Sequence, residues 1–288
     1  MKVELYNDIL KTIKTYNGPG RKCEKLLREK YPNVSDYTLG SIYSFEYQRK
    51  MKKNHQKFSK MTEELYRRYQ KSVDDGQDVG VMLRLAEEIT LSPALLARMI
   101  LEKYYEKKSE ESDEPVTRTF ITKLMKDTTL IKDKDLAYEV YLCVVYDDQY
   151  GSITDCIKHS LGQEYELRLQ RMVKDLNLAF RDEEHLRKHG YDKTPDIKLE
   201  IPIAVDGFIV NWIESKALFG DEEGHNIYFR DQYLSYWNRF GPGLVIYWFG
   251  FVETLQHQTE KCIIIREDFP INITLMDPKS IEPNLATI

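Results

Sequence analysis

Hydrophobic residues recur along the chain in two different patterns, and the change from one to the other divides it. Up to about residue 176, apolar positions recur at the spacing of helices, as Leu5, Ile9 and Ile13 do. After residue 196, two apolar runs of strand length flank Asp206-Gly207, a dipeptide that predicts a tight hairpin. A third run, Leu244 to Val252, is apolar enough for a buried central strand. The pattern predicts an α+β protein, with an all-α N-terminal region followed by a domain that contains a sheet.

Three helices are predicted between residues 5 and 60, in the outline of a helix-turn-helix module. Gly18-Pro19-Gly20 ends the first helix, and Ser35 is placed to cap the third. The third helix ends in a basic run, Tyr47 to Lys60, whose six cations face no acid within the run. Such a run suits contact with phosphate groups, and it equally suits a solvated helix end. The residues predicted to contact nucleic acid here are Arg49, Lys50, Lys52 and Lys53.

A second helix-turn-helix is predicted from a helix over residues 81–89, a turn over 90–93 and a helix over 94–108. Ser92 at the N-cap followed by Pro93 at the first helical position is the preferred start of a helix. The second helix carries one arginine, Arg98, and no Asn or Gln that could read adenine. Contact of Arg98 with phosphates is therefore expected in preference to base readout. A purely architectural helical bundle is the alternative.

The acidic segment from Ser109 to Pro115 lacks apolar residues, which predicts a linker. Helices are predicted to resume over 117–126 and 134–148, and a long helix opens near Gly162. We therefore expect three parts. These are a helical region containing helix-turn-helix units over 1–112, a helical connector over 113–155 and a sheet-containing domain over 156–288.

Two carboxylates and a lysine gather around the predicted hairpin. Asp196 precedes its first strand, while Glu214 and Lys216 end the second strand two positions apart and so point to the same face. Mg²⁺ takes oxygen ligands and often only one or two protein carboxylates, with phosphate oxygens supplying others. A metal held in this way suits the hydrolysis of phosphodiester bonds.

The hairpin contains a geometric difficulty. A two-residue turn at Asp206-Gly207 sets Leu199 opposite Glu214 and leaves Asp196 three positions away, roughly 10 Å at about 3.3 Å per residue. That separation is too large for a shared metal. We therefore predict a bulge or a wider loop in the first strand, with Pro202 as its place because proline cannot donate to a ladder.

The residues of the hairpin carry a resemblance. Pro195-Asp196 followed by Glu214-x-Lys216 is similar to the signature of the PD-(D/E)XK nuclease superfamily. The sequence around it resembles the TPD-motif family, in the stretches Lys193–Asp196, Trp212–Ala217 and Tyr236–Trp248. The resemblance implies a restriction-endonuclease-like α/β core, in which helices flank a mixed sheet.

The resemblance also assigns roles. It implies metal ligation by Asp196, Glu214 and the Ser215 carbonyl, with Lys216 orienting the attacking water. It further implies a glutamate on the helix that opens the core, where Glu164 fits slightly better than Glu166. Gln232 and Tyr236 resemble a Q-x-x-x-Y motif that flanks the active site, so Gln232 is expected in catalysis and Tyr236, with Arg239, in contact with DNA. A half-buried helix face is the alternative for both motif residues.

Cofactor, partners and location follow from the same resemblance as expectations. The cofactor is expected to be Mg²⁺ or Mn²⁺, and the partners DNA and a codanin-like protein. The expected location is the nucleus and cytoplasm.

Composition modifies the picture in three ways. The net charge of −5 divides into +6 over residues 1–100 and −11 over the rest, which fits a grip on a polyanion beside a metal site. The alternative is a set of solvated lysines. Four scattered cysteines without C-x-x-C predict a reducing compartment. The apolar run near the C-terminus spans nine residues, too few to cross a bilayer, so no membrane partner is expected.

Three functions remain open on these grounds. The first is a Mg²⁺-dependent nuclease. The second is a nuclease-fold scaffold that binds a partner or nucleic acid without cutting. The third is a transcription regulator built on helix-turn-helix units.

Overall fold

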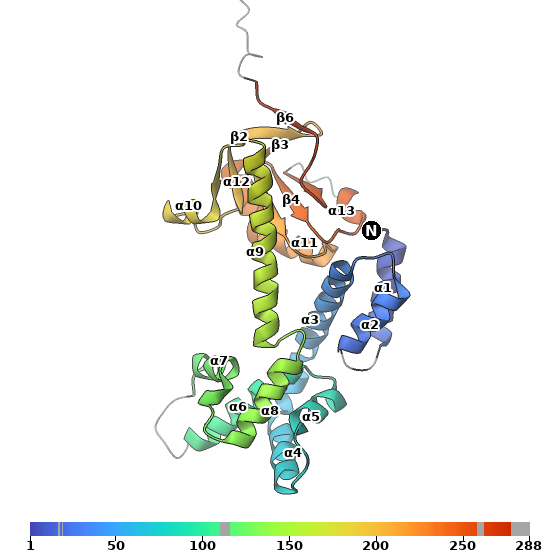
Figure 1. Cartoon of the computed structure of the whole chain (residues 1–288), viewed down its shortest axis with the longest axis vertical. Coiled ribbons are helices and arrows are strands. Elements are labelled where there is room, and N and C mark those ends of the chain that lie inside the picture. Colours follow the sequence, from blue (N-terminus) through green and yellow to red (C-terminus); the bar gives the residue numbers. More distant parts are fainter. Residues whose placement is uncertain (17, 19, 110–115, 258–261, 278–288) are drawn as a thin grey trace, which may run out of the picture. The chain divides into compact units, whose positions relative to one another are not determined.

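The computed structural model describes residues 1–16, 18, 20–109, 116–257 and 262–277 (Figure 1). The chain forms two compact units, one comprising residues 9–160 and the other residues 1–8 with 161–288. The divisions fall within the first and the ninth α-helix. The predicted α+β class is confirmed, because a helical region is followed by a mixed sheet with flanking helices. The three-part division predicted from the sequence stays a prediction, and its linker at 110–115 lies outside the described residues.

The first unit in chain order contains these helical elements: α1 (Val3–Thr15, shared with the other unit), α2 (Gly20–Lys30), α3 (Asp36–Lys60), α4 (Thr62–Asp74), α5 (Val81–Ile89), α6 (Pro93–Ser109), α7 (Arg118–Lys126), the 3₁₀ turn η1 (Thr128–Leu130), α8 (Lys134–Tyr146) and the start of α9 (Ser152–Asp175). The unit with the sheet contains the strands β1 (Phe180–Asp182), β2 (Ile197–Val205), β3 (Phe208–Lys216), β4 (Gly243–Tyr247), β5 (Ile263–Arg266) and β6 (Ile273–Leu275). Its helical elements after α9 are α10 (Glu183–Lys188), α11 (Glu222–Tyr228), the π-helical segment η2 (Phe229–Tyr233), α12 (Leu234–Phe240) and α13 (Thr254–His257).

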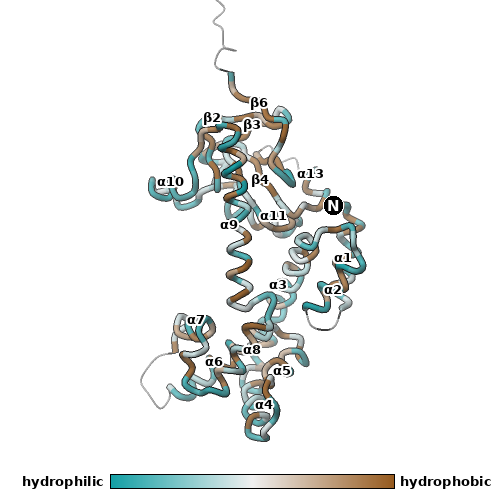
Figure 2. The backbone as a smooth tube through the Cα atoms, viewed as in Figure 1, coloured by the Kyte–Doolittle hydropathy of each residue, from teal (hydrophilic) through white to brown (hydrophobic). Residues whose placement is uncertain are grey.

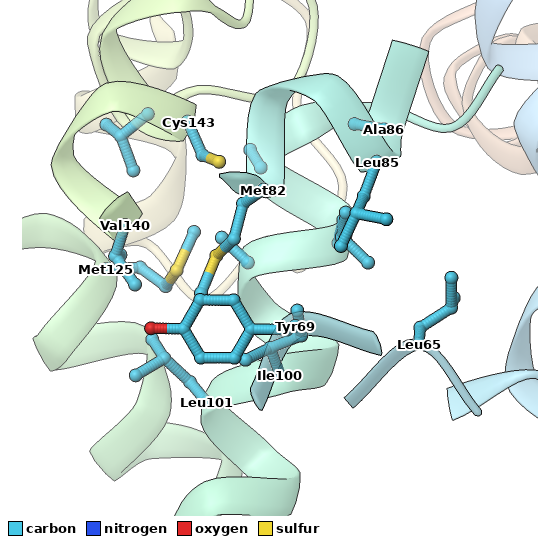
Figure 3. Close-up of a cluster of buried hydrophobic side chains, with 14 of the residues drawn as sticks. Leu65, Tyr69, Met82, Leu85, Ala86, Ile100, Leu101, Met125, Val140 and Cys143 are labelled. Carbon is cyan, nitrogen blue, oxygen red and sulfur yellow. The ribbon is translucent and has the colours of Figure 1, made fainter. Parts of the chain in front are cut away.

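A large hydrophobic core in the helical unit is built from residues of α3 to α8 (Figure 3). Tyr69, Met82 and Leu101 meet there from three different helices. The change between hydrophobic and hydrophilic residues along each helix is visible in Figure 2. Burial of the apolar side of each helix is the main source of stability in such a bundle.

The predicted second helix-turn-helix forms as two helices, but α6 is not an exposed recognition helix. It packs against α4, α5, α7 and α8, and Leu96 and Ala97 are fully buried. Arg98 is half-buried and donates to the Thr122 hydroxyl of α7 at 3.3 Å. A helix that enters a DNA groove must present a free face. The packing of α6 fits the architectural role given as the alternative, and contact of Arg98 with phosphate stays a prediction.

Buried carboxylates hold the starts of both of these helices. Glu139 accepts the backbone N–H groups of Gly80, Val81 and Met82 at 2.6, 3.1 and 2.9 Å, at the start of α5. Asp147 accepts from the Ser92 hydroxyl and from the Ala94 N–H at the start of α6. An anion at a helix N-terminus satisfies donors that the helix leaves unpaired. These contacts come from distant parts of the chain, so the sequence pattern did not predict them.

The sheet has the order β1-β2-β3-β4-β5, and β6 also pairs with β2. β1, β2 and β3 run antiparallel, while β3, β4 and β5 run parallel. Successive β3 side chains point to opposite faces. Ile213 belongs to a cluster with Leu169 and Val173 of α9, whereas Trp212 contacts the Tyr236 ring of α12. The sheet is therefore covered by α9 on one face and by α12 on the other. None of the described helices combines the length and the hydropathy needed to span a lipid bilayer.

The predicted hairpin and its irregularity are both confirmed. Asp206 and Gly207 have φ of 50° and 81°, the left-handed pair of a type I′ turn. Ile203 pairs with Val210, but Lys198 pairs with Trp212. Four residues of β2, 199–202, therefore face one residue of β3, and Pro202 lies within this bulge. The shift advances the start of β2 by three positions relative to β3.

Candidate active site

The bulge in β2 brings Asp196 beside Glu214. Ile197 pairs with Ile213 in an antiparallel register. Asp196, which precedes Ile197, therefore lies next to Glu214, which follows Ile213. The Asp196 carboxylate accepts the Ser215 backbone N–H through Oδ2 at 2.7 Å. Without the bulge, three residues would separate Asp196 from the position opposite Glu214, and the bulge removes that separation.

Lys216 joins the two carboxylates from the same face of β3. Its Nζ donates to Glu214 Oε1 at 2.7 Å and to Gln232 Oε1 at 3.0 Å. The Tyr228 ring lies beneath the ammonium, with its centroid 4.6 Å from Nζ. Gln232 lies in the π-helical segment η2, a type of helical irregularity that is frequent at functional sites. The sequence predicted Gln232 here, but the contact with Tyr228 was missed because no pattern marks it.

These groups open into a cavity of about 420 Å³ within the sheet-containing unit, which we call the carboxylate cavity. It is lined by Glu183, Arg187, Asp192, Lys193, Thr194, Asp196, Glu214, Asp231, Gln232 and Tyr236. Its size suits a small part of a substrate, such as one phosphate group with its neighbouring sugar.

Electrostatics in the cavity favour a bound cation. Burial, with the nearby Glu214 carboxylate, raises the pKa of Asp196 well above its usual value. Burial alone would lower the pKa of the Lys216 ammonium, but Glu214 and Asp196 outweigh it and the net direction is upward. Two carboxylates held together out of water repel each other, and a positive charge between them relieves that repulsion.

One atom of the site lacks a partner that a cation would supply. Glu214 is 4 % exposed, and its Oε2 is buried without a hydrogen-bond partner among the described residues. The described part of the chain contains no group of three or more His, Cys, Asp and Glu residues that could hold a metal ion. A pair of carboxylates such as Asp196 and Glu214 suits Mg²⁺, which usually takes one or two carboxylates and keeps water and phosphate oxygens as its other ligands. Asp196 and Glu214 therefore fit a hard divalent cation.

Two glutamates of α9, Glu164 and Glu166, are the predicted candidates for a further metal ligand. Glu166 is half-buried and is one of the groups that raise the pKa of Asp196. It lies three and seven positions before Leu169 and Val173, the buried side of α9. Glu164 is exposed, on another side of the helix, and is not among those groups. The two glutamates lie on different sides of the helix, because two positions along a helix turn a side chain by about 200°, and the completion of the metal site by either of them stays a prediction.

Tyr236 does not have the exposed position expected of a DNA contact. It is 3 % exposed, and its hydroxyl donates to the Thr194 carbonyl at 2.8 Å. The ring therefore supports the loop before Asp196, and the half-buried face given as the alternative applies to it. Arg239 is bound to the same loop, through Asp192 Oδ1 at 2.6 Å and the Lys193 carbonyl at 3.3 Å. A contact of Arg239 with nucleic acid stays a prediction.

The other predicted nucleic-acid contacts lie on α3, in the helical unit. Lys50, Lys52 and Lys53 are exposed, so they are accessible to a phosphate backbone. Arg49 pairs with Glu46 at 2.8 Å, one helical turn before it. Glu46 lies just outside the basic run, so this pairing leaves the absence of acids within the run unchanged.

Replacement of Asp196 by asparagine is expected to stabilise the metal-free protein. A raised pKa means that the folded chain holds the Asp196 proton more tightly than the unfolded chain does. As pH rises from about 4, the usual pKa of an unfolded aspartate, the wild type loses stability that the asparagine variant keeps. We expect Tm to rise by roughly 2–6 °C at neutral pH and the gain to shrink toward pH 4.

Thermal unfolding with and without Mg²⁺ checks this. Mg²⁺ should raise the Tm of the wild type but not of Asp196→Asn. An Asp196→Asn variant whose Tm is below that of the wild type at pH 7.5, and at least as far below it at pH 4.5, would show that burial does not destabilise the ionised carboxylate.

Comparisons with known proteins show the family to which the chain belongs. Residues 132–269 match a family described as "Protein of unknown function TPD sequence-motif". CDAN1-interacting nuclease 1 of Xenopus laevis is 44% identical over 273 residues, which cover 94% of this chain and 89% of that protein. The Homo sapiens protein of that name is 44% identical over 90% of this chain and 92% of its own length, and that of Danio rerio 44% over 89% and 85%. No solved structure matches the chain. This extent of similarity, with Thr194-Pro195-Asp196 at the mouth of the site, shows that the chain belongs to the TPD-motif family, together with the CDAN1-interacting nuclease 1 proteins.

Proposed function

We propose that this protein is a divalent-metal-dependent nuclease that hydrolyses phosphodiester bonds in DNA. The observation that carries the proposal is the convergence of the Asp196 and Glu214 carboxylates beside the Lys216 ammonium. The buried, unpaired Oε2 of Glu214 supports the choice of a cation as the missing partner. The relatives are named nucleases, which agrees with this chemistry.

Asp196 and Glu214 would hold the cation, with the Ser215 carbonyl as a further oxygen donor. When bound, Mg²⁺ or Mn²⁺ supplies Lewis-acid polarisation of the phosphoryl group and lowers the pKa of a water molecule. Lys216, protonated on Nζ, donates toward the charge that develops on the phosphate oxygens. Gln232 and Tyr228 keep that ammonium in place by accepting from it and by facing it with a ring. Burial of these groups strengthens each interaction, because the surroundings screen charge poorly.

Binding of a codanin-like protein is part of the proposal, since the relatives are named for an interaction with CDAN1. Location in the nucleus and cytoplasm stays a prediction from the sequence.

A cleavage screen tests the proposal. Purified protein is incubated with labelled single-stranded, duplex, flap and junction DNA and with RNA, in Mg²⁺, in Mn²⁺ and in EDTA. We expect cleavage of at least one DNA substrate in Mg²⁺ or Mn²⁺ and none in EDTA. Absence of cleavage in every metal-containing reaction would contradict the enzyme assignment.

A further inference from the structure

Two positively charged residues line the carboxylate cavity, Arg187 and Lys193. Lys193 donates to the Asp231 carbonyl at 2.6 Å, within the same cavity lining. Arg187 is also exposed, with 56% of its side chain accessible. A nuclease site needs a group that holds a phosphate of the substrate, and we consider Arg187 for that role because its guanidinium offers more donors than an ammonium.

Arg187 is fixed in place by Glu183, one turn earlier on α10. Its Nε and Nη2 donate to the same oxygen, Glu183 Oε1, at 3.0 and 2.5 Å. A guanidinium has five N–H donors in one plane. Because a single oxygen engages two nitrogens, at least three donors remain for a ligand, and phosphate oxygens match that planar arrangement.

Thr194 connects this pair to the loop that carries Asp196. The Thr194 hydroxyl donates to Glu183 Oε1 at 3.2 Å, and Thr194 is 5% exposed. Its carbonyl accepts from Tyr236, whose own pKa is raised by burial and by the nearby Glu214 and Asp196 carboxylates. The threonine two positions before Asp196 therefore links the position of the Arg187 guanidinium to that of the carboxylates.

We propose that Arg187 binds a phosphate of the nucleic-acid backbone next to the bond that is cut, and that Glu183 and Thr194 are its positioning residues. The position of this phosphate next to a cut bond rests on the proposed nuclease function, whereas binding of the phosphate can be measured without cleavage. It also gives Thr194 a role beyond the turn before Asp196.

The same helix provides a matched control. Lys188 pairs with Glu184 at 2.7 Å in the same i,i+4 arrangement, and both side chains are well exposed. Neither residue lines the carboxylate cavity; both line a second cavity beside β1. Arg187→Ala and Lys188→Ala each remove one cation from an exposed ion pair on α10, so they have similar effects on net charge and on the helix.

Binding is measured by fluorescence anisotropy with a labelled single-stranded DNA and a labelled duplex, in EDTA and over a series of salt concentrations. Arg187→Ala should weaken binding about tenfold, the loss of one charged hydrogen-bonding contact, and reduce the slope of log affinity against log salt by about 1. The affinity of Arg187→Lys for DNA should lie between those of the wild type and Arg187→Ala, since lysine keeps the charge but lacks the planar arrangement of donors. Lys188→Ala should match the wild type. Equal binding and equal slopes for Arg187→Ala and Lys188→Ala would overturn the proposal.

Kinetics in Mg²⁺ provide the second measurement. Arg187→Ala should raise KM about tenfold with little change in kcat, because a contact with a neighbouring phosphate acts on the bound substrate and the transition state alike. Thr194→Val should change KM in the same direction by less, and Thr194→Ser should restore it. If Arg187→Ala cleaves DNA with the same KM as the wild type, the inference is overturned, while the nuclease function is unaffected. A wild type that binds DNA through Arg187 but cleaves nothing would contradict the function and support the inference.

Discussion

Glu214→Gln is expected to lower the rate of Mg²⁺-dependent DNA cleavage by on the order of 10³-fold. Glu214 contributes Oε2, a buried oxygen that has no hydrogen-bond partner within the described parts of the chain, and it lies against Asp196 in the same cavity. Glutamine has the same shape but no negative charge, so it would hold a divalent cation much more weakly. Its amide oxygen can still accept from Lys216, and the variant should therefore fold.

Initial cleavage rates at a fixed Mg²⁺ concentration, with circular dichroism as a check of folding, measure the effect. Glu200→Gln is the matched control. Glu200 is a glutamate of the neighbouring strand β2 that pairs with Arg181 outside the carboxylate cavity, so its variant should cleave at the wild-type rate. Comparable rates for folded Glu214→Gln and the wild type would mean that another site is responsible for cleavage.

Lys216→Met should reduce kcat by about 10²- to 10³-fold without weakening the binding of Mg²⁺. The Lys216 side chain is only 13% exposed, and its ammonium donates to Glu214 Oε1. Its removal takes away the donor to the developing phosphate charge, but it also removes a cation that competes with Mg²⁺ for Glu214. The variant therefore separates catalysis from metal binding, which Glu214→Gln does not.

Calorimetric titration with Mg²⁺ and single-turnover cleavage measure the two effects. Lys198→Met is the control, because Lys198 is a β2 lysine that lies 3.7 Å from Glu200 and does not line the carboxylate cavity. Full cleavage activity in Lys216→Met would exclude this lysine from the reaction. Loss of Mg²⁺ binding together with activity would show that it serves only to arrange the carboxylates.

The sequence was most informative where a local pattern determines the structure. The alternation of residues fixes Glu214 and Lys216 on one face of β3, and Asp206-Gly207 requires a two-residue turn. These two facts were inconsistent with a shared site unless β2 contained extra residues. The bulge at 199–202 was thus predictable as the resolution of a conflict between local rules.

The sequence was less informative where contacts between distant segments decide. Glu164 and Glu166 both stand near the start of the predicted helix, and only the packing of Leu169 and Val173 shows that Glu166 lies closer than Glu164 to the buried side of that helix. A tyrosine such as Tyr236 can be a surface contact or a buried support, and its bond to the Thr194 carbonyl, 42 residues away, decides between them. In the same way, the helix-turn-helix pattern of α5 and α6 specified two helices but not the four neighbours that cover α6.

The most direct test of the account is the position of Mn²⁺ in crystals of the wild-type protein grown at saturating Mn²⁺, located by anomalous scattering. The account predicts a peak about 2 Å from carboxylate oxygens of both Asp196 and Glu214. Well-ordered carboxylates at these two residues with no anomalous peak between them would contradict it.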